Sequence, residues 1–394
     1  MVYELRALQA QDMTAAWELG STTFGYRDRE MPESWTSDSP GRNTLGAFDE
    51  SGRLVAKAVD REQEHWFGGR LVPTSGVAGV AVVPDQRRGG LGRLVLTRLL
   101  AQARERGAAI STLYPTTPFP YRALGWEDVG SLTYTAFPAT AFAHIRPAEG
   151  YSLRPAVEAD VPAIHGLYRA VAQASTGLME RSGPLFTGDL LTSFHGVTVA
   201  IGPSGLVEGY MSWDRASGYD SNGKVTVYDL LGAGGEATAT LLSMLAGWAS
   251  VAPTVVLRLS DPDPAQFFVS AMLGRRDYHN TWMLRVVDAP AAVAARGWPT
   301  VLTGSVRLTI EDPQCPWNTG AFRLDLEGGQ AKLSPSSGDD GGAAFTPRGL
   351  ALWYAGAVDP VILRRSGLLG GDSGGDDLLR AATAGPPPTL LDYF

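Results

Sequence analysis

The residues best suited to chemistry lie in a turn that is rich in glycine and arginine. The stretch "VAVVPDQRRGGLGRLVL" (80–96) combines a β-branched run, a proline, three arginines and three glycines. Glycines between a strand and a helix let successive backbone N–H groups converge on an anion, and the helix N-terminus adds the positive end of its dipole. Arg87 and Arg88 add charge at the rim. This turn is therefore suited to a pyrophosphate, and a plain tight turn is the alternative.

Other nucleotide-binding patterns fit this turn less well. A P-loop requires Gly-Lys-Ser or Gly-Lys-Thr after its glycines, and neither is present. A dinucleotide-binding fold prefers a clean G-x-G-x-x-G with an acidic residue about 20 positions later.

The flanking sequence predicts the elements that position this turn. The run 80–83 predicts a buried strand that Pro84 ends, because proline cannot donate to a strand ladder. The following helix is expected to bury Leu91, Leu94, Val95, Leu99 and Leu100. A second strand is expected at 110–114. Tyr121 then opens a short helix that ends at Gly125, and Trp126 begins another strand.

Two stretches of the chain repeat each other. "YELRALQAQDMTAAWEL" starts at Tyr3 and "YSLRPAVEADVPAIHGL" starts at Tyr151. Each predicts a short strand, an aspartate at a helix start and an amphipathic helix. The strand, glycine-rich turn and helix at 76–103 recur in the same order as "KVTVYDLLGAGGEATATLL" from Lys224. Two related α/β domains are therefore expected at 1–147 and 148–292.

The sequence changes character after about residue 295. Strand-like stretches separated by turns alternate with short helices that Thr346 and Asp359 would start. A third, α+β domain is expected at 293–394, with a flexible acidic loop at 367–377.

Composition narrows the classes of partner. The 394 residues carry a net charge of −8, from 41 acidic against 33 basic residues. This balance argues against a nucleic-acid binder and is compatible with a cationic ligand. One cysteine, Cys315, and five scattered histidines predict neither a disulfide nor a metal site. No apolar run of about 18 residues and no leader pattern occurs, so we expect no membrane span and a cytoplasmic location.

The ordered motifs carry a family resemblance. Arg87-x-x-Gly90-x-Gly92 after a strand, followed by Tyr121 and Leu124-Gly125-Trp126, resembles the GNAT superfamily of acetyl-CoA-dependent N-acetyltransferases. Two tandem units of this kind, a third domain that looks like a sterol carrier protein and a terminal phenylalanine resemble the Eis family, the enhanced-intracellular-survival acetyltransferases of actinobacteria. The stretch "CPWNTGAF" (315–322) also looks like that family.

The resemblance implies specific roles for residues of this chain. Tyr121 would be the general acid, and the carboxylate of Phe394 would be the general base. The acceptor would be a primary amine of a cationic small molecule, either aminoglycoside-like or lysine-like, and the assembly a homohexamer. Asp28, Glu30 and Trp35 are candidates for substrate contact. Contacts with acetyl-CoA are implied at Val80, Ala81, Val82, Arg87, Arg88, Gly89, Gly90, Leu91, Gly92, Arg93, Thr116 and Thr117.

The second unit departs from the cofactor pattern. Its turn "LLGAGGEA" has no arginine, and Glu236 would repel a pyrophosphate, so only the first unit is expected to bind CoA.

Several alternatives remain at this stage. The chain could be a non-catalytic ligand- or lipid-binding protein built on degenerate GNAT and sterol-carrier-like domains. "GDSGG" (371–375) matches the nucleophile motif of chymotrypsin-like proteases, but no histidine has the required setting. Tyr121 could simply pack over the cofactor arm. The apolar tail of Leu390, Leu391, Tyr393 and Phe394, which follows three prolines, either fixes the terminal carboxylate in a cleft or serves only as packing.

Overall fold

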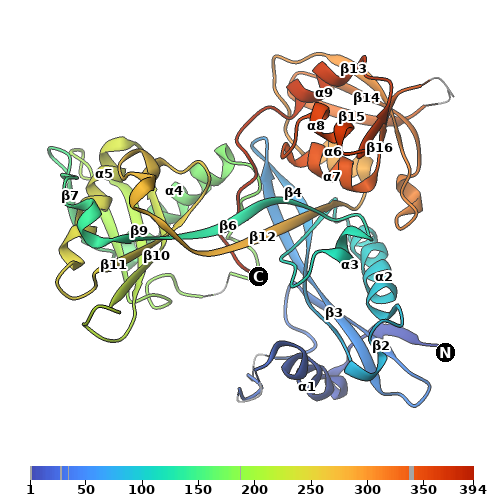
Figure 1. The fold of residues 1–394 in the computed structure, drawn as a ribbon, viewed down its shortest axis with the longest axis horizontal. Helices are drawn as coiled ribbons and strands as arrows, with labels where there is room; N and C mark the ends of the chain where they lie inside the picture. The colour runs from blue at the N-terminus through green and yellow to red at the C-terminus, as the bar shows by residue number, and fades with distance from the viewer. Residues whose placement is uncertain (1, 27–28, 34, 187, 337–340) are drawn as a thin grey trace.

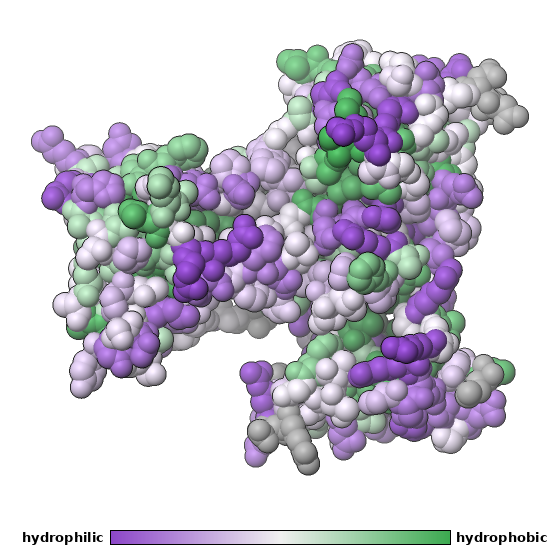
Figure 2. Space-filling view, in the orientation of Figure 1, coloured by the Kyte–Doolittle hydropathy of each residue, from purple (hydrophilic) through white to green (hydrophobic). Residues whose placement is uncertain are grey.

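The computed structural model describes residues 2–26, 29–33, 35–186, 188–336 and 341–394. It contains a twelve-stranded sheet, in the order β1-β2-β3-β4-β5-β12-β6-β11-β10-β9-β8-β7, and a five-stranded sheet, in the order β15-β14-β13-β16-β17. Helices pack against both sheets, and the chain forms three lobes (Figure 1). Figure 2 shows the same lobes in space-filling form, with an indentation between the lobe at left and the lower lobe.

The first half of the chain supplies five strands and helices before the glycine-rich turn and four after it. They are β1 (Glu4–Ala7), α1 (Met13–Phe24), β2 (Arg42–Phe48), β3 (Leu54–Phe67), β4 (Arg70–Val82), α2 (Leu91–Glu105), β5 (Ile110–Leu113), α3 (Phe119–Arg122) and β6 (Glu127–Pro138).

The second half repeats this order of strands and helices, although individual elements differ in length. They are β7 (Ser152–Pro155), α4 (Val161–Ala174), β8 (Gly196–Ile201), β9 (Val207–Arg215), β10 (Lys224–Gly232), α5 (Gly235–Ser243), β11 (Thr254–Leu259) and β12 (Arg275–Val286).

The smaller sheet and its helices form the third lobe. Its elements are α6 (Ala289–Ala295), β13 (Gly304–Ile310), β14 (Gly320–Glu327), β15 (Gln330–Pro335), β16 (Ala343–Phe345), α7 (Pro347–Ala355), α8 (Pro360–Arg365), β17 (Leu369–Gly371) and α9 (Asp376–Ala382). Thr346 and Asp359 cap α7 and α8 as expected, each by accepting a backbone N–H bond. The flexible loop expected at 367–377 is wrong in part, because β17 and the start of α9 lie within it.

The two repeated stretches have the same local structure. Arg6 forms a two-pronged ion pair with Asp12, and Arg154 forms the matching pair with Asp160; the shortest N–O distance is 2.6 Å in both. Each aspartate also accepts a backbone N–H bond three residues before it and lies at the start of a helix. The repeat seen in the sequence therefore corresponds to two equivalent strand–helix units.

The two halves share strands, which the sequence did not indicate. β12 lies between β5 and β6, with Met283 opposite Leu113 and Leu284 opposite Glu127. The distal part of β6 pairs in turn with β11, from Thr133 to Pro138. Figure 1 shows β6 and β12 as two long strands that run from one half to the other. The part of the twelve-stranded sheet that the first half forms is therefore completed by β12, the last strand of the second half.

β4 and β5 run parallel only over a short distance. Thr74–Val77 pair with Ile110–Leu113, and β4 then continues to Val82 without β5 beside it. β4 also carries one extra residue relative to β3, because Val59 lies opposite Ala78 while Lys57 lies opposite Ala81. Gly79 adopts φ +55 at this bulge. The bulge and the diverging strands leave an opening at the C-terminal end of β4.

Within the described ranges, none of the helices combines the length and the apolar composition that crossing a bilayer requires. On α2, Leu94 is 39% exposed, so its expected burial is wrong. The other leucines and the valine expected on that face are buried.

Candidate active site

A cavity of about 510 Å³ lies where β4 and β5 diverge. It is bounded by β4, the glycine-rich turn, the start of α2, α3 and one residue of α1. It brings Tyr121 together with seven of the expected acetyl-CoA contacts, which are Val80, Val82, Arg87, Gly92, Arg93, Thr116 and Thr117.

The remaining expected contacts lie around this cavity or beneath it. The side chains of Ala81 and Leu91 are 2% exposed and pack in the core, so only their backbone could face a ligand. Gly89 is exposed in the turn. Arg88 and Gly90 both have positive φ, +67 and +84, so the turn places two residues in the left-handed region within three positions.

The turn has the geometry of an anion site. The first N–H groups of α2 have no partner within the helix, and Gly90 is its N-cap residue. Arg87 donates through Nε to the carbonyl of Val82, at 3.2 Å, which places its guanidinium beside the cavity. An exposed ion pair between Arg53 and Asp85, at 3.0 Å, ties the start of the turn to the β2–β3 connection. Helix dipole, free N–H groups and arginine charge therefore act on the same space.

Tyr121 faces this cavity from α3. Its side chain is 8% exposed, and its ring lies edge-on to Trp126 with the centroids 6.2 Å apart. Burial raises the pKa of Tyr121 to about 12. The phenol therefore stays protonated throughout the neutral and mildly alkaline range.

The C-terminal tail contacts both halves of the chain. Thr389 donates its N–H to the carbonyl of Thr176, at 2.8 Å, and forms a bridge with Ser131 of β6. Leu390 and Leu391 are buried. Tyr393, by contrast, is 64% exposed and its ring lies tilted against that of Tyr114, so its expected role as an apolar anchor is wrong.

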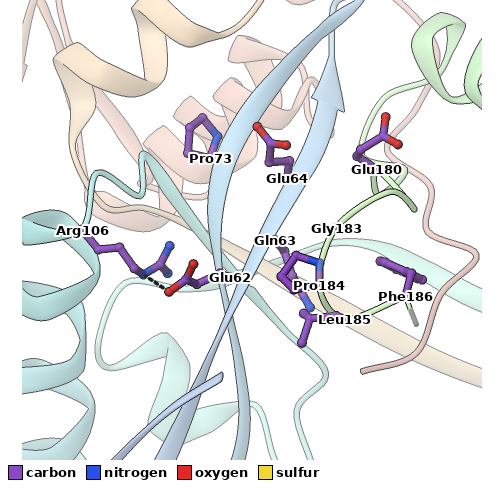
Figure 3. A pocket seen from close by; sticks show the side chains of 10 residues that line it. All are labelled: Glu62, Gln63, Glu64, Pro73, Arg106, Glu180, Gly183, Pro184, Leu185 and Phe186. Atoms are coloured by element: carbon purple, nitrogen blue, oxygen red, sulfur yellow. Dashed lines mark ion pairs between the residues drawn. The ribbon is translucent and has the colours of Figure 1, made fainter. Parts of the chain in front are cut away.

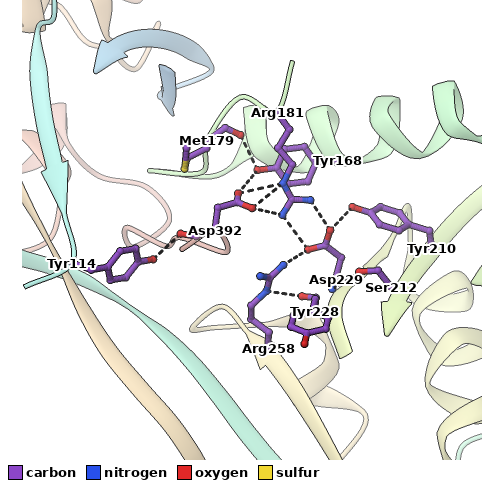
Figure 4. Close-up of polar contacts among 10 residues, drawn as sticks. All are labelled: Tyr114, Tyr168, Met179, Arg181, Tyr210, Ser212, Tyr228, Asp229, Arg258 and Asp392. Atoms are coloured by element: carbon purple, nitrogen blue, oxygen red, sulfur yellow. Dashed lines mark hydrogen bonds and ion pairs between the residues drawn. The ribbon is translucent and has the colours of Figure 1, made fainter. Parts of the chain in front are cut away.

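Asp392 is the part of the tail that the sequence analysis missed. Its carboxylate lies 2.9 Å from Nη2 of Arg181, and the Tyr168 hydroxyl donates to it at 3.3 Å (Figure 4). The Tyr114 hydroxyl donates to its backbone carbonyl at 2.9 Å. The only signal in the sequence was one acidic residue within an otherwise apolar end.

Arg181 belongs to a buried network in the second half. It pairs with Asp229, and Asp229 also accepts from Arg258 at 2.7 Å and from the Tyr210 hydroxyl at 2.9 Å (Figure 4). Burial disfavours the charged form of Asp229, but the two arginines outweigh it and hold the pKa of Asp229 well below its usual range. Asp392 thus completes a network of two arginines and two carboxylates.

Phe394 does not line the cavity that contains Tyr121. Its ring contacts Tyr114, at 5.5 Å between centroids, and His65, at 6.4 Å. Tyr114 directly follows β5 and precedes Thr116 of the cavity by two residues. The structure therefore places the end of the tail near the diverging strands but brings no described contact between Phe394 and Tyr121.

His65 is the histidine that the fold brings to the tail. It is fully buried, and because Gly177 offers it only a carbonyl oxygen at 2.7 Å, its Nδ1 must carry the proton. Burial lowers the pKa of His65 to about 4, so the ring is neutral at physiological pH.

The expected substrate contacts have different outcomes. Asp28 lies outside the described residues. Glu30 is exposed. Trp35 is half-buried, packs edge-on to Trp17 at 5.3 Å and donates its indole N–H to the carbonyl of Met13. Of the three, only Trp35 therefore packs against another element, the helix α1.

Carboxylates gather instead in a cavity of about 230 Å³ beside β3 (Figure 3). Glu62, Glu64 and Glu180 line it together with Arg106, which lies 3.9 Å from Glu62. Arg106 follows the last residue of α2, whose 15 residues span about 22 Å at 1.5 Å per residue. These acids therefore lie a helix length from the glycine-rich turn.

Three parts of the chain match known domain families. Residues 4–129 and 177–286 match two acetyltransferase (GNAT) domain families, and residues 289–390 match a sterol carrier protein domain. The expected succession of two GNAT domains and a sterol-carrier-like domain is confirmed.

Curated relatives of this chain are named as N-acetyltransferases. An uncharacterized N-acetyltransferase of Streptomyces griseus is 26% identical over 355 residues, which is 82% of each chain. One of Streptomyces coelicolor is 27% identical over 308 residues, or 74% of this chain and 73% of the relative.

Solved structures of other proteins are similar to this chain over its whole length. A GCN5-related N-acetyltransferase from Kribbella flavida superposes with a TM-score of 0.84 at 28% identity, covering 100% of this chain and 98% of the other. Eis1 from Mycobacterium abscessus has a TM-score of 0.75 at 22% identity, with 99% and 100% covered, and so shares the fold.

Proposed function

We propose that this protein, an N-acetyltransferase with two GNAT domains and a sterol carrier protein domain, transfers the acetyl group of acetyl-CoA to a primary amine in its first GNAT domain. One observation carries the proposal. A single cavity joins the Arg87–Gly92 turn, the end of β4 that has no β5 partner and the hydroxyl-bearing ring of Tyr121.

The turn and the strand would hold the cofactor. The free N–H groups at the start of α2, with Arg87 and Arg93 at the rim, suit a pyrophosphate. The backbone of 80–82 pairs with β3 but has no β5 partner, and Arg87 bonds the carbonyl of Val82. The groups that remain free on the β5 side would bind the amides of the pantetheine arm. In this arrangement the thioester would lie at the diverging strands, beside Tyr121.

Tyr121 would assist the leaving group. The amine nitrogen attacks the thioester carbonyl, the C–S bond breaks, and the sulfur needs a proton. A thiol has a pKa of about 8.5, so full transfer from a phenol near 12 is uphill by about 3.5 units, or about 5 kcal/mol. Tyr121 therefore acts first by donating a hydrogen bond to the developing thiolate, and the proton moves as the thiol leaves.

The Phe394 carboxylate would accept the proton that the amine loses, directly or through one water. The docked tail supports this role, because Leu390 and Leu391 are buried and Asp392 is ion-paired. Burial of a carboxylate raises its pKa, and a site that excludes water lowers that of an ammonium.

The second GNAT domain would not bind CoA. Glu236 lies in the first turn of α5, where the first domain has Gly92, and its negative charge would repel a pyrophosphate. The family resemblance further supports a lysine-like or aminoglycoside-like acceptor, a cytoplasmic homohexamer and no other cofactor. Light scattering of the purified chain tests the oligomeric state.

The test of the function is transfer itself. The full chain is incubated with acetyl-CoA and a panel of primary amines, and acetylated amines and free CoA thiol are measured by mass spectrometry. We expect stoichiometric formation of both products. Binding of acetyl-CoA without transfer to any amine would instead indicate a non-catalytic binding protein.

A further inference from the structure

Three basic side chains share one face of the β2–β3 pair. Arg42 and Arg61 are direct cross-strand partners, and Lys57 precedes Arg61 by four residues. Residues two and four apart on a strand point to the same side, so all three lie on one face. Like charges directly opposite each other destabilise a sheet. This arrangement therefore needs a compensating partner.

The described residues offer no anionic partner. Lys57 is 1% exposed, and neither a hydrogen bond nor an ion pair joins it to any residue that the structure describes. The Nε atoms of Arg42 and Arg61 are likewise buried, and no described residue hydrogen-bonds to either of them. Burial and the neighbouring arginine lower the pKa of Lys57 to about 8, and burial and Arg61 lower that of Arg42 to about 10.

Aromatic rings line the cluster but do not neutralise it. The Arg42 guanidinium lies 3.8 Å from the Trp35 ring centroid, and the Lys57 ammonium lies 4.9 Å from it. Trp17 packs between Trp35 and Tyr26, at 5.3 and 5.0 Å. Cation–π contacts orient and partly stabilise these charges, yet the net positive charge remains.

The cluster approaches the cofactor cavity on one side and the tail on the other. Lys57 is opposite Ala81 on β4 and shares its face of the sheet, whereas the next side chain, Val82, lines the cavity from the other face. Its ammonium approaches Gly20 of α1, three residues before Thr23, which lines the cavity as well. At the other end, Arg61 and the phenol of Tyr393 act on each other electrostatically.

We propose that Arg42, Lys57 and Arg61 form an anion-binding subsite for the acceptor, which is therefore a primary amine that also carries a carboxylate or phosphate group. This inference rests on the proposed function. The anionic group would neutralise the cluster, while the amine end reaches the thioester. A polycation without an anionic group would be repelled, so the subsite favours a lysine-like acceptor over an aminoglycoside-like one.

Matched acceptors test the subsite. Glycine, 4-aminobutyrate and 6-aminohexanoate are each compared with their amides, which keep the amine and lose the carboxylate. We expect kcat/KM for at least one acid to exceed that of its amide by about tenfold or more, the range of a charge-assisted hydrogen bond. In Lys57→Met that preference should fall to near unity.

A second lysine provides the control. Lys332 is exposed on β15 in the third domain, so Lys332→Met makes the same chemical change away from the subsite. It should keep the wild-type preference. If Lys57→Met fails to fold, Arg61→Gln serves in its place. A wild-type preference for the amides, or an acid preference that survives both substitutions, overturns the subsite.

A binding measurement separates this inference from the proposed function. Hexanoate and inorganic phosphate, which have no amine, are titrated calorimetrically into the acetyl-CoA-loaded protein. Binding that Lys57→Met weakens and Lys332→Met does not supports the subsite even if no amine is acetylated. Transfer to amines without any anion binding or acid preference supports the function and rejects the subsite.

Discussion

Asp392 and Arg181 join the end of the chain to the second GNAT domain across 211 positions, with both Nε and Nη2 of the arginine within hydrogen-bonding distance of the carboxylate. The third domain thus contributes its tail to a charge network that Arg181, Asp229 and Arg258 already form. The tail is therefore fixed by a specific ion pair as well as by two buried leucines.

Replacing Asp392 by asparagine should loosen the tail without unfolding the protein, because Arg181 keeps its pair with Asp229. A hydrogen bond to a charged group contributes about 1.5–3 kcal/mol. We expect faster hydrogen exchange at 388–394 and a fall in kcat of about tenfold or more, with acetyl-CoA affinity unchanged. Asp377→Asn, at a side chain that is 96% exposed, is the control. Wild-type exchange in the Asp392 variant would contradict the anchoring role.

Gly90→Leu should abolish acetyl-CoA binding. Gly90 has φ +84, so a side chain strains the turn and also projects where the pyrophosphate would lie. Gly52 offers a matched control, because it has φ +81 and equally open surroundings in the β2–β3 connection. Gly52→Leu should lose similar stability, about 1–2 kcal/mol, and keep its affinity. Calorimetry that shows equal affinity in both variants would reject the turn as the cofactor site.

Tyr121→Phe should lower kcat by roughly 10²–10⁴ with acetyl-CoA affinity near normal. The ring remains packed against Trp126 and only the hydroxyl is lost. Because the pKa of Tyr121 is about 12, its deprotonation should not limit the wild-type rate below about pH 11. Tyr151→Phe in the second domain is the control. Wild-type turnover in Tyr121→Phe would reduce the residue to packing.

The sequence predicted those parts of the site that a short segment determines. The glycine-rich turn, Tyr121, the repeated strand–aspartate–helix units from Tyr3 and Tyr151 and the helix caps at Thr346 and Asp359 all depend on neighbours within a few residues. Each has a recognisable residue type at a fixed spacing.

Features that depend on long-range pairing could not be predicted in this way. The insertion of β12 beside β5 joins segments more than 160 residues apart, and no local pattern encodes it. Arg42 and Arg61 look like ordinary surface charges until the β2–β3 register places them opposite each other. Likewise, the local sequence around Asp392 or around Arg181 does not indicate that the two residues pair. Tyr393 was misjudged because an aromatic residue in an apolar tail need not be the one that is buried.

His65 should make the protein sensitive to mild acid. Its folded pKa, about 4, is below the unfolded value of about 6.5. Between these two pKa values the unfolded chain binds a proton that the buried ring does not. The free energy of unfolding is therefore highest above pH 6.5 and decreases as the pH falls toward 4, by up to about 3 kcal/mol. His65→Asn keeps a donor for the Gly177 carbonyl and cannot take up a proton. Denaturant unfolding should show a weaker pH dependence for this variant between pH 6.5 and 4.5; equal slopes would contradict the assignment.

The terminal carboxylate gives the last prediction. A free α-carboxyl has a pKa of about 3.5, which is about 6.5 units below that of an alkylammonium near 10, a mismatch of about 9 kcal/mol. An exposed terminus could not overcome this mismatch. A docked one could, because burial moves both pKa values toward each other. The role therefore depends on the position of the carboxylate and not on the apolar contacts alone.

A Gly-Ser extension after Phe394 separates position from packing. Leu390, Leu391 and the Asp392 ion pair remain, and the Phe394 ring can still contact His65 and Tyr114, but the charge moves away by two residues. We expect kcat to fall by roughly 10²–10⁴, the usual contribution of a general base, with acetyl-CoA affinity retained. Deletion of Phe394 moves the carboxylate to Tyr393 and removes the ring contacts as well, so it should cost at least as much. If the extended chain acetylates amines at the wild-type rate, the carboxylate is not the base and the tail serves only to pack the three domains together.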